Sequence, residues 1–89
     1  MIVDKKELAN ALFEIGKFYF FNESYDEALR VLKKSADLNK KEPEIYYQMG
    51  LVYEAKNENV SAKEMYLKAL ELNPRFCVAQ EHLDRLVGK

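Results

Sequence analysis

The chain has 89 residues, which is enough for one small domain. Hydrophobic residues make up 48% and charged residues 33%, a balance typical of a folded rather than a disordered chain. With 14 basic and 15 acidic side chains the formal net charge is -1, so no overall field favours nucleic acid or an anionic membrane. No apolar run approaches the ~18 residues that cross a bilayer. We therefore expect neither nucleic acid nor membrane as a partner.

The first residues and the cysteine count bear on location. The sequence becomes charged directly after Val3 and has no apolar signal-peptide core at its start. The single cysteine, Cys77, has no partner for an internal disulfide, which fits a reducing compartment. We therefore expect a cytoplasmic location.

A first helix is predicted over about residues 5–21. Its apolar residues recur at steps of three and four, the spacing of one helix face. These residues are Leu8, Leu12, Ile15 and Tyr19. Asp4 is placed to cap the helix start, and Glu7, three residues later, completes the pattern of a capping box. The polar residues 22–24 then break the helical pattern.

A second helix is predicted over about residues 25–38. The hydroxyl of Ser24 is expected to accept from backbone N–H groups of its first turn. One side of this helix carries small and apolar residues that are expected to face the core, namely Ala28, Val31, Leu32 and Ser35. Asp26 and Arg30 stand four residues apart on the side that faces water, and we expect them to pair.

Three further helices are predicted. Pro43 suits the first turn of a helix that reaches about Lys56, because its missing N–H costs nothing there. The next covers about residues 60–72 and ends at Asn73, since a residue before proline resists helical geometry. Its expected core face consists of Ala62, Met65, Tyr66, Ala69 and Leu70. The last helix covers about residues 75–87.

The sequence repeats at an offset of 34 residues, the separation of Gly16 and Gly50. Further matching pairs are Tyr19 with Tyr53, Ala28 with Ala62, Lys34 with Lys68 and Leu38 with Leu72. A fixed period of this size indicates a stack of supersecondary units. A glycine inside a helix costs ~1 kcal/mol relative to alanine. Two glycines at the same phase therefore predict positions where helices approach each other closely.

This spacing resembles the tetratricopeptide repeat, which has the same period. The first unit carries Leu12, Ile15, Gly16, Tyr19, Ala28 and Leu32 at the repeat positions of that family. The second unit carries Tyr46, Met49, Gly50, Tyr53, Ala62, Tyr66, Ala69 and Pro74. Leu12 stands where the family most often has tryptophan, and Lys40 where it often has proline.

The resemblance implies an all-α fold, an antiparallel helix-hairpin solenoid of five helices. It describes residues 1–89 as a single domain with repeat 1 at about 9–42 and repeat 2 at about 43–76. A capping helix at about 75–87 follows the second repeat. The small residues at the repeat positions allow neighbouring helices to pack closely, and the bulky ones fill the space between those contacts.

The resemblance also implies a binding surface, because the first helix of each repeat lines the concave face in this family. The groove residues expected from the first repeat are Asn10, Phe13, Glu14, Lys17 and Phe20, with Phe21 beside them. The second repeat contributes Glu44, Tyr47, Gln48, Leu51 and Glu54. The capping helix contributes His82 and Arg85, with Val78 and Glu81 beside them. Alternatively, the phenylalanines are ordinary core residues.

Acidic side chains outnumber basic ones in this set, so a ligand with apolar anchors and some basic character is favoured. Some relatives bind the acidic C-terminal tails of chaperones through a clamp of lysine, arginine and asparagine. Here Phe13 stands where one lysine is expected, Lys17 and Gln48 where asparagines are, and Val78 and His82 where the last lysine and arginine are. Capture of a carboxylate needs convergent donors, and we do not expect chaperone-tail binding.

No catalytic or metal-binding pattern is present. His82 is the only histidine, and Cys77 lies five residues away, which misses the one-turn spacing of helical ligand pairs. No glycine-rich phosphate loop or nucleophile motif occurs in the sequence. We expect no enzymatic activity, no cofactor and no metal.

Two functions follow from the repeat. The first is a protein–protein interaction module, an adaptor or scaffold that binds a peptide or helix of a partner protein in the concave groove. The alternative is a homo-oligomerisation module, because two repeats are fewer than the three or so that such a stack usually needs. Apolar residues at the start of the chain, Ile2, Val3 and Leu8, would then be covered by a second copy.

Overall fold

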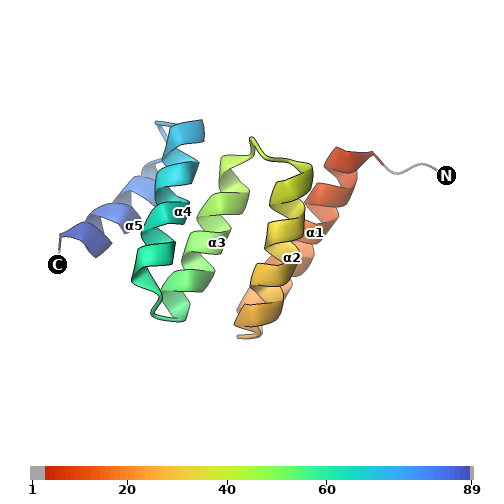
Figure 1. The fold of residues 1–89 in the computed structure, drawn as a ribbon, viewed down its shortest axis with the longest axis horizontal. Coiled ribbons are helices and arrows are strands. Elements are labelled where there is room, and N and C mark those ends of the chain that lie inside the picture. Colours follow the sequence, from red (N-terminus) through yellow and green to blue (C-terminus); the bar gives the residue numbers. More distant parts are fainter. Residues whose placement is uncertain (1–3, 89) are drawn as a thin grey trace.

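Residues 4–88 are described by a computed structural model, and within this range the chain forms five α-helices (Figure 1). They are α1 (Lys5–Phe21), α2 (Tyr25–Leu38), α3 (Pro43–Ala55), α4 (Asn59–Leu72) and α5 (Cys77–Val87). Helices α1 and α2 form one antiparallel hairpin and α3 and α4 a second, while α2 also packs on α3 and α4 on α5. The predicted all-α helix-hairpin solenoid is confirmed.

The helix boundaries agree closely with the sequence pattern. Helices α1 and α2 have the predicted bounds, α3 ends one residue before Lys56, and α4 begins at Asn59, one residue earlier than predicted. The start of α5 was wrong by two residues, because it begins at Cys77 and not at Arg75. The Asn73 side chain accepts from the backbone N of Arg75 at 3.1 Å, and the Asn73 carbonyl accepts from Phe76 N at 3.1 Å. This turn holds Arg75 outside the helix.

Both hairpins turn in the same way. Glu23 and Asn57, which are 34 residues apart, have left-handed backbones with φ of 61° and 63°. In each turn the next backbone N–H reaches back five residues, from Ser24 to Tyr19 O and from Glu58 to Tyr53 O, both at 2.9 Å. This is the Schellman arrangement that closes a helix C-terminus. The repeat in the sequence is therefore a repeat in the backbone.

The predicted helix caps differ in outcome. Asp4 caps α1 as predicted, because its carboxylate accepts from Lys6 N at 3.1 Å. Ser24 precedes α2, but its hydroxyl makes no capping hydrogen bond, so that prediction was wrong. Its backbone, with ψ of 71°, lies outside the extended region that aims an N-cap side chain at the next turn. The tight turn after α1 imposes this geometry.

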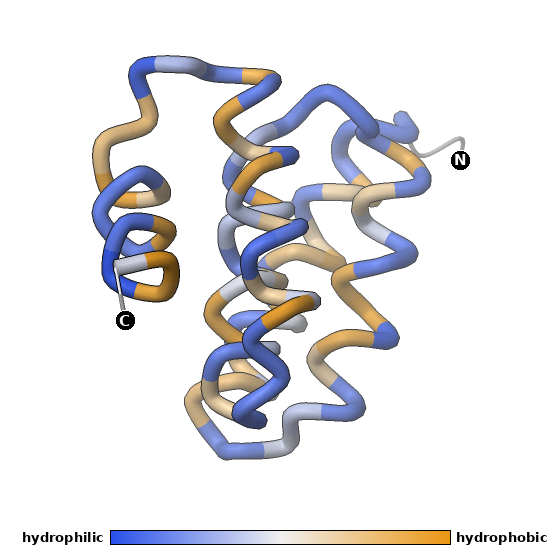
Figure 2. The backbone as a smooth tube through the Cα atoms, turned by 60° about the vertical axis from the view of Figure 1, so that its left-hand side comes forward, coloured by the Kyte–Doolittle hydropathy of each residue, from blue (hydrophilic) through white to orange (hydrophobic). Residues whose placement is uncertain are grey.

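The core contains two apolar clusters, one between α2 and α3 and one between α4 and α5. The first joins α2 to α3 through Ala28, Leu29, Leu32, Ala36, Ile45, Met49 and Val52. The second joins α4 to α5 through Ala62, Tyr66, Ala69, Ala79 and Leu83. The predicted face of α2 is buried, whereas Met65 and Leu70 on α4 are only half-buried. Figure 2 shows apolar and polar segments alternating along the helices, as amphipathic packing requires.

The two interior glycines mark the closest helix contacts. A Cβ atom on Gly16 would lie 2.6 Å from Leu32 Cγ, and one on Gly50 would lie 2.7 Å from Tyr66 Cδ1. Leu32 and Tyr66 are both fully buried, so neither side chain has room to move away. The predicted reason for the glycines, close approach within each hairpin, agrees with these distances.

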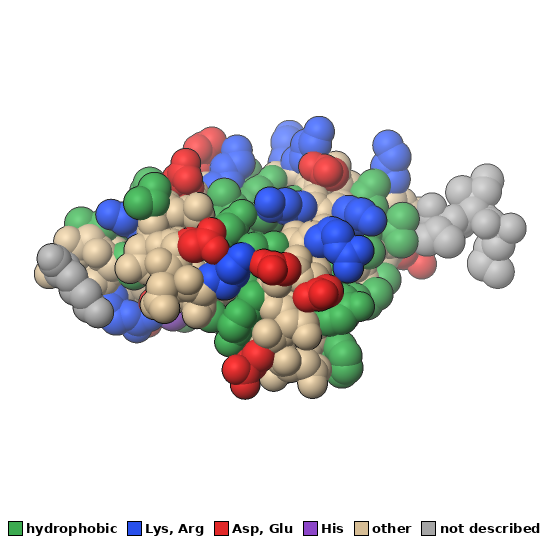
Figure 3. All heavy atoms as spheres, turned by 60° about the horizontal axis from the view of Figure 1, so that its bottom comes forward, with side chains coloured by type: hydrophobic (Ala, Val, Ile, Leu, Met, Phe, Trp, Pro, Cys, Tyr) green, Lys and Arg blue, Asp and Glu red, His purple; other side chains and the backbone are tan. Residues whose placement is uncertain are grey.

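Polar contacts also join the two hairpins. Lys56 Nζ lies 2.6 Å from Asp26 Oδ1 and 3.1 Å from Glu58 Oε2. Asp26 therefore pairs with Lys56, and the predicted pair of Asp26 with Arg30 was wrong. The hydrogen bond from Lys56 lowers the pKa of Asp26. The carboxylate is exposed, so the pair adds little stability. Figure 3 shows acidic and basic side chains interspersed on the face that includes this end of the helices.

Candidate functional site

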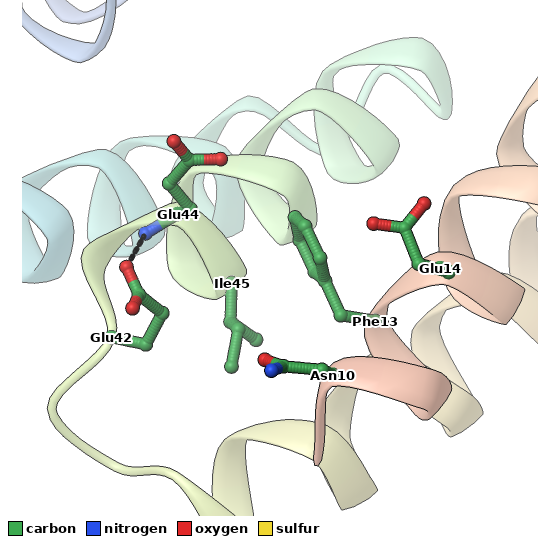
Figure 4. A pocket seen from close by; sticks show the side chains of 6 residues that line it. All are labelled: Asn10, Phe13, Glu14, Glu42, Glu44 and Ile45. Carbon is green, nitrogen blue, oxygen red and sulfur yellow. Dashed lines mark hydrogen bonds between the residues drawn. The ribbon is translucent and has the colours of Figure 1, made fainter. Parts of the chain in front are cut away.

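A hollow of about 270 Å³ lies between α1 and α3. Its lining residues are Asn10, Phe13 and Glu14 from α1, together with Glu42, Glu44 and Ile45 at the start of α3. Figure 4 shows Asn10 and Phe13 extending from α1 toward α3, with Ile45 facing them. Four of the predicted groove residues, Asn10, Phe13, Glu14 and Glu44, are thus brought together at one place.

The hollow combines an apolar floor with an acidic rim. Phe13 is half-buried and packs against the first core cluster, and Ile45 is almost fully buried below it. The carboxylates of Glu14, Glu42 and Glu44 surround this floor. Lys17 lies beside the hollow, with its Nζ 3.2 Å from Glu14 Oε2 and 4.8 Å from the centroid of the Phe13 ring. The lining side chains themselves include three carboxylates and no cation, so the lining is negative.

Glu42 was not predicted to be a site residue. Its carboxylate accepts from the backbone N of Glu44 at 3.4 Å and so acts as the N-cap of α3. This cap turns the side chain back over the helix start, beside the hollow (Figure 4). The sequence contained one indication that Glu42 caps α3. It directly precedes Pro43, and a polar side chain just before a proline at the first helical position can accept from the N–H groups of the helix start.

A second group of predicted residues meets between α3, α4 and α5. The Tyr47 ring lies 5.1 Å from Phe76, 5.6 Å from His82 and 5.9 Å from Tyr66, measured between ring centroids. Offset and edge contacts at these distances are favourable between aromatic rings. Tyr47 and His82, which are 35 residues apart in the sequence, therefore belong to one aromatic cluster.

Glu54 organises the polar side of that cluster. Its Oε1 accepts from Tyr66 Oη at 2.7 Å and lies 3.2 Å from His82 Nδ1, while its Oε2 accepts from Arg85 Nη2 at 3.1 Å. Arg85 Nη2 is also 2.7 Å from His82 Nδ1. Nδ1 accepts from Arg85 when it carries no proton and donates to Glu54 when it carries one, so the tautomer decides which contact forms. These contacts fasten α5 to α3.

The environment shifts the pKa values of the three acids in this cluster. Burial raises the pKa of Glu54, but hydrogen bonds donated by Tyr66, Arg85 and His82 outweigh it, so the net shift is downward. Burial and the Glu54 carboxylate both raise the pKa of Tyr66, so its phenol stays protonated and keeps donating. Burial, with the Glu54 charge second, also raises the pKa of Tyr47.

The hydroxyl of Tyr66 was missed as a member of this cluster. Tyr66 was predicted only as a core position, matched with Leu32 in the first repeat. The repeat alignment could not indicate that its ring is fully buried while its hydroxyl reaches Glu54, because the equivalent leucine has no polar atom. The sequence did contain one indication, because a tyrosine stands at this core position in the second repeat and not in the first. A buried hydroxyl needs a hydrogen-bond partner.

The remaining predicted groove residues are spread over α1, α3 and α5. Gln48 is buried, with 7% of its surface exposed. Leu51 is half-buried against the second cluster, and Phe20 is half-buried against the first, with its ring 6.0 Å from that of Tyr25. Phe21 is 78% exposed. The two phenylalanines therefore differ, one being partly core and the other open to solvent.

The Glu54 contacts predict an acid-sensitive stability. The pKa of Glu54 is lower in the folded chain than in the unfolded chain, where it is near 4.5. Ionised Glu54 therefore stabilises the fold at pH values above about 4.5, and this stabilisation is lost as the pH falls through the folded-state pKa. We expect the urea midpoint of the parent to exceed that of Glu54→Gln at neutral pH, with the difference shrinking below about pH 4.5. The exposed Glu81→Gln is the control and should follow the parent. A constant difference between parent and Glu54→Gln at all pH values would contradict the assigned contacts.

Two further features are absent from residues 4–88, a metal site and a membrane-spanning helix. Within this range, no three histidine, cysteine, aspartate or glutamate side chains are grouped so as to hold a metal ion. No helix in the same range is long and apolar enough to cross a membrane. Cys77, at the start of α5, is exposed.

The stacked hairpins, their shared turn and the glycine contacts define a helical-repeat protein. A family model described as TPR repeat matches residues 16–57, and one described as tetratricopeptide repeat matches residues 43–76. The chain belongs to the tetratricopeptide-repeat family. The resemblance of the sequence to this family is confirmed, and the second model covers the predicted second repeat closely.

Individual proteins resemble this chain, in sequence or in fold, over most of its length. The chloroplastic protein SLOW GREEN 1 of Arabidopsis thaliana is 30% identical over 84 residues, which are 94% of this chain and 27% of that protein. The crystal structure of MamA superposes with a TM-score of 0.87 at 27% identity, over 91% of this chain and 47% of that one. The structure of the C. elegans SMG5–SMG7 complex superposes with a TM-score of 0.84 at 21% identity, over 91% of this chain and 21% of that one. The chain thus spans less than half of each relative.

Tetratricopeptide repeats form protein–protein interaction modules, and proteins of this family generally act as non-enzymatic scaffolds. The repeats therefore indicate that this chain is a protein–protein interaction module. The fold does not determine which surface binds a partner or which partner is bound, because both depend on the side chains of this chain.

Proposed function

We propose that this chain is a non-enzymatic adaptor that binds a peptide or helix of a partner protein along α1, α3 and α5. The observation that carries the proposal is the hollow between α1 and α3, where Phe13 offers an apolar contact inside a rim of carboxylates. Binding sites for peptides generally combine an apolar pocket with a few polar groups that fix orientation.

The ligand favoured by this hollow has an apolar side chain next to a lysine or arginine. The apolar group would lie on Phe13, and the basic group would meet Glu14, Glu42 and Glu44. An exposed charge pair at 4 Å is worth only ~1 kcal/mol in water, so the carboxylates mainly select among ligands and the apolar contact supplies most of the affinity. An acidic tail is disfavoured, which is a second reason against chaperone-tail binding.

Selection from a displayed library of random peptides tests this proposal. We expect enrichment of peptides that carry an apolar residue beside lysine or arginine. Binding of an enriched peptide should fall at least tenfold in the double variant Glu14→Lys, Glu44→Lys, because both residues are exposed and the change reverses the charge of the rim. Isothermal titration calorimetry at two salt concentrations measures the loss and its screening.

The matched control is the double variant Glu64→Lys, Glu71→Lys. It makes the same change in net charge at two exposed positions of α4, away from the hollow, and should bind like the parent. Phe13→Ala should also weaken binding, with circular dichroism used to check that the fold is kept. Enrichment of acidic peptides, or equal binding by both double variants, would refute the proposal.

Self-assembly is a second candidate function, because one specific observation favours it. Leu8 on α1 is 43% exposed, and other large apolar side chains of the same helix are exposed with it. The other two residues named for this role, Ile2 and Val3, lie outside the described residues. A module with this surface would join two copies of itself and could present two peptide-binding sites in one assembly.

A further inference from the structure

Helix α1 has an apolar side that no part of residues 4–88 covers. Four of the eight large exposed apolar side chains in this range belong to α1, namely Leu8 at 43%, Ile15 at 44%, Phe18 at 64% and Phe21 at 78% exposed. Leu8, Ala11, Ile15 and Phe18 follow one another at steps of three and four and so form one stripe, called here the α1 stripe. Helix α1 packs mainly on α2 and contacts α3 at few positions.

The second repeat provides an internal comparison for this stripe. At the offset of 34 residues, Ile15 corresponds to Met49, which is 5% exposed, and Phe18 to Val52, which is fully buried. These residues of α3 are covered by α2 within the first core cluster. From Ala11 to Phe18 the α1 stripe is thus the same helix face, apolar at the positions of Ile45, Met49 and Val52, and within residues 4–88 it lacks the covering helix.

At the other end of the stack, two polar residues of α5 occupy positions that face the next helix in the repeats. Asp84 and Gln80 of α5 stand at the positions of Gly50 and Tyr46, where the repeats receive their next helix. Both side chains are exposed, and Gln80 Nε2 donates to Asp84 Oδ1 at 2.8 Å. Stacking copies head to tail would press these polar groups on the α1 stripe and bury them without new partners. Contact between two α1 stripes instead covers apolar surface with apolar surface and leaves these polar groups in water.

We propose that two copies of this chain associate through their α1 stripes, which pack antiparallel about a two-fold axis. This inference rests on the second candidate function and names its interface. Phe18 then faces Leu8 of the partner subunit, and Ile15 faces Ala11 of the partner subunit. Large residues meet smaller ones at each level, as close packing requires. A parallel pair would instead set Phe18 against Phe18 and Ala11 against Ala11, with crowding at one level and a void at the other.

The size of the contact sets the expected strength. Helix α1 has 17 residues and, at 1.5 Å per residue, is about 25 Å long. One helix from each subunit makes an interface at the small end of the specific ones. The dimer is therefore expected to dissociate on dilution, and the two peptide-binding hollows remain separate from the pairing stripe.

Molar mass across concentration is the first test, measured by sedimentation equilibrium on the full chain. We expect the mass to rise from 10.4 kDa toward twice that value between roughly 1 and 500 μM, where interfaces of this size dissociate. A mass of 10.4 kDa at every concentration would overturn both self-assembly and the α1 pairing.

Substitutions on the α1 stripe distinguish self-assembly in general from pairing through this stripe. Phe18→Glu and Ile15→Glu should each keep the chain monomeric, because they place carboxylates inside the contact. The control is Leu67→Glu on α4, where a leucine that is 54% exposed receives the same charge and the dimer should persist. A Phe18→Glu protein that is folded by circular dichroism and still dimerises like the parent would leave self-assembly standing and overturn the α1 pairing.

Cross-linking tests the direction of the helices. In a Cys77→Ser background, chains with Ala11→Cys and chains with Ile15→Cys are mixed and oxidised. The antiparallel arrangement brings these two positions within the range that a disulfide spans, so mixed dimers of the two variants are expected. Predominant homodimers of each variant would indicate a parallel pair, and the absence of any cross-link would also overturn the proposed arrangement.

Discussion

Leucine in place of Gly50 is expected to lower the free energy of unfolding by roughly 3 kcal/mol, a large part of the stability of a domain this small. Even a Cβ atom at this position comes within 2.7 Å of Tyr66 Cδ1. The Tyr66 ring is fully buried and its hydroxyl is bonded to Glu54, so it cannot swing aside. Relief would require separation of α3 from α4. Urea denaturation at neutral pH measures the change.

The matched control is Ala55→Leu, which adds a large side chain to an exposed position of the same helix. Its effect is expected to stay within about 0.5 kcal/mol. Ala62→Leu, at a fully buried position of α4, should resemble Gly50→Leu. A Gly50→Leu protein that unfolds at the same urea concentration as Ala55→Leu would show that the glycine has no packing role.

Truncation of Tyr66 to alanine should cost about 4 kcal/mol, the usual range for removing a large buried aromatic side chain. The ring also holds Tyr47 and His82, and the hydroxyl is one of the donors to Glu54. Tyr66→Phe keeps the ring and loses only this hydrogen bond, for which about 1 kcal/mol is expected. Urea denaturation measures both values, and hydrogen exchange should reveal faster opening of α5.

Tyr46→Phe is the control for the hydroxyl, because Tyr46 Oη donates to the Lys40 carbonyl at 3.0 Å in an exposed setting. Removal of that group should change stability far less than removal of the Tyr66 hydroxyl. Equal losses in Tyr66→Phe and Tyr66→Ala would mean that the hydroxyl, and not the ring, dominates. Equal losses in the two phenylalanine variants would remove the special role assigned to Glu54.

The sequence predicted most of the fold because its repeat and its helix ends are local signals. Asp4 and Pro43 mark helix starts, and the 34-residue offset aligns Gly16 with Gly50. The start of α5 was placed two residues early because Asn73 closes its turn with both its side chain and its carbonyl. Whether an asparagine closes a turn in this way depends on backbone geometry that the residue types do not fix.

The candidate site was less predictable, because it depends on contacts between helices. Glu54, His82 and Arg85 were expected to line a groove, but which donors reach the carboxylate depends on how α5 leans on α3. Burial of equivalent residues also differs for a nonlocal reason. Ile15 and Met49 have the same role in the repeat, and only the second has a helix packed over it.

The stacked arrangement has a consequence for how the chain reaches this structure. Each helix packs mainly on the helix before it and the helix after it. Few contacts therefore require the closing of a long loop, which is the slow and entropically costly step of folding. Either hairpin can form first and serve as the surface on which the other assembles. The chain is expected to fold quickly, with a rate governed by hairpin formation rather than by a search for distant partners.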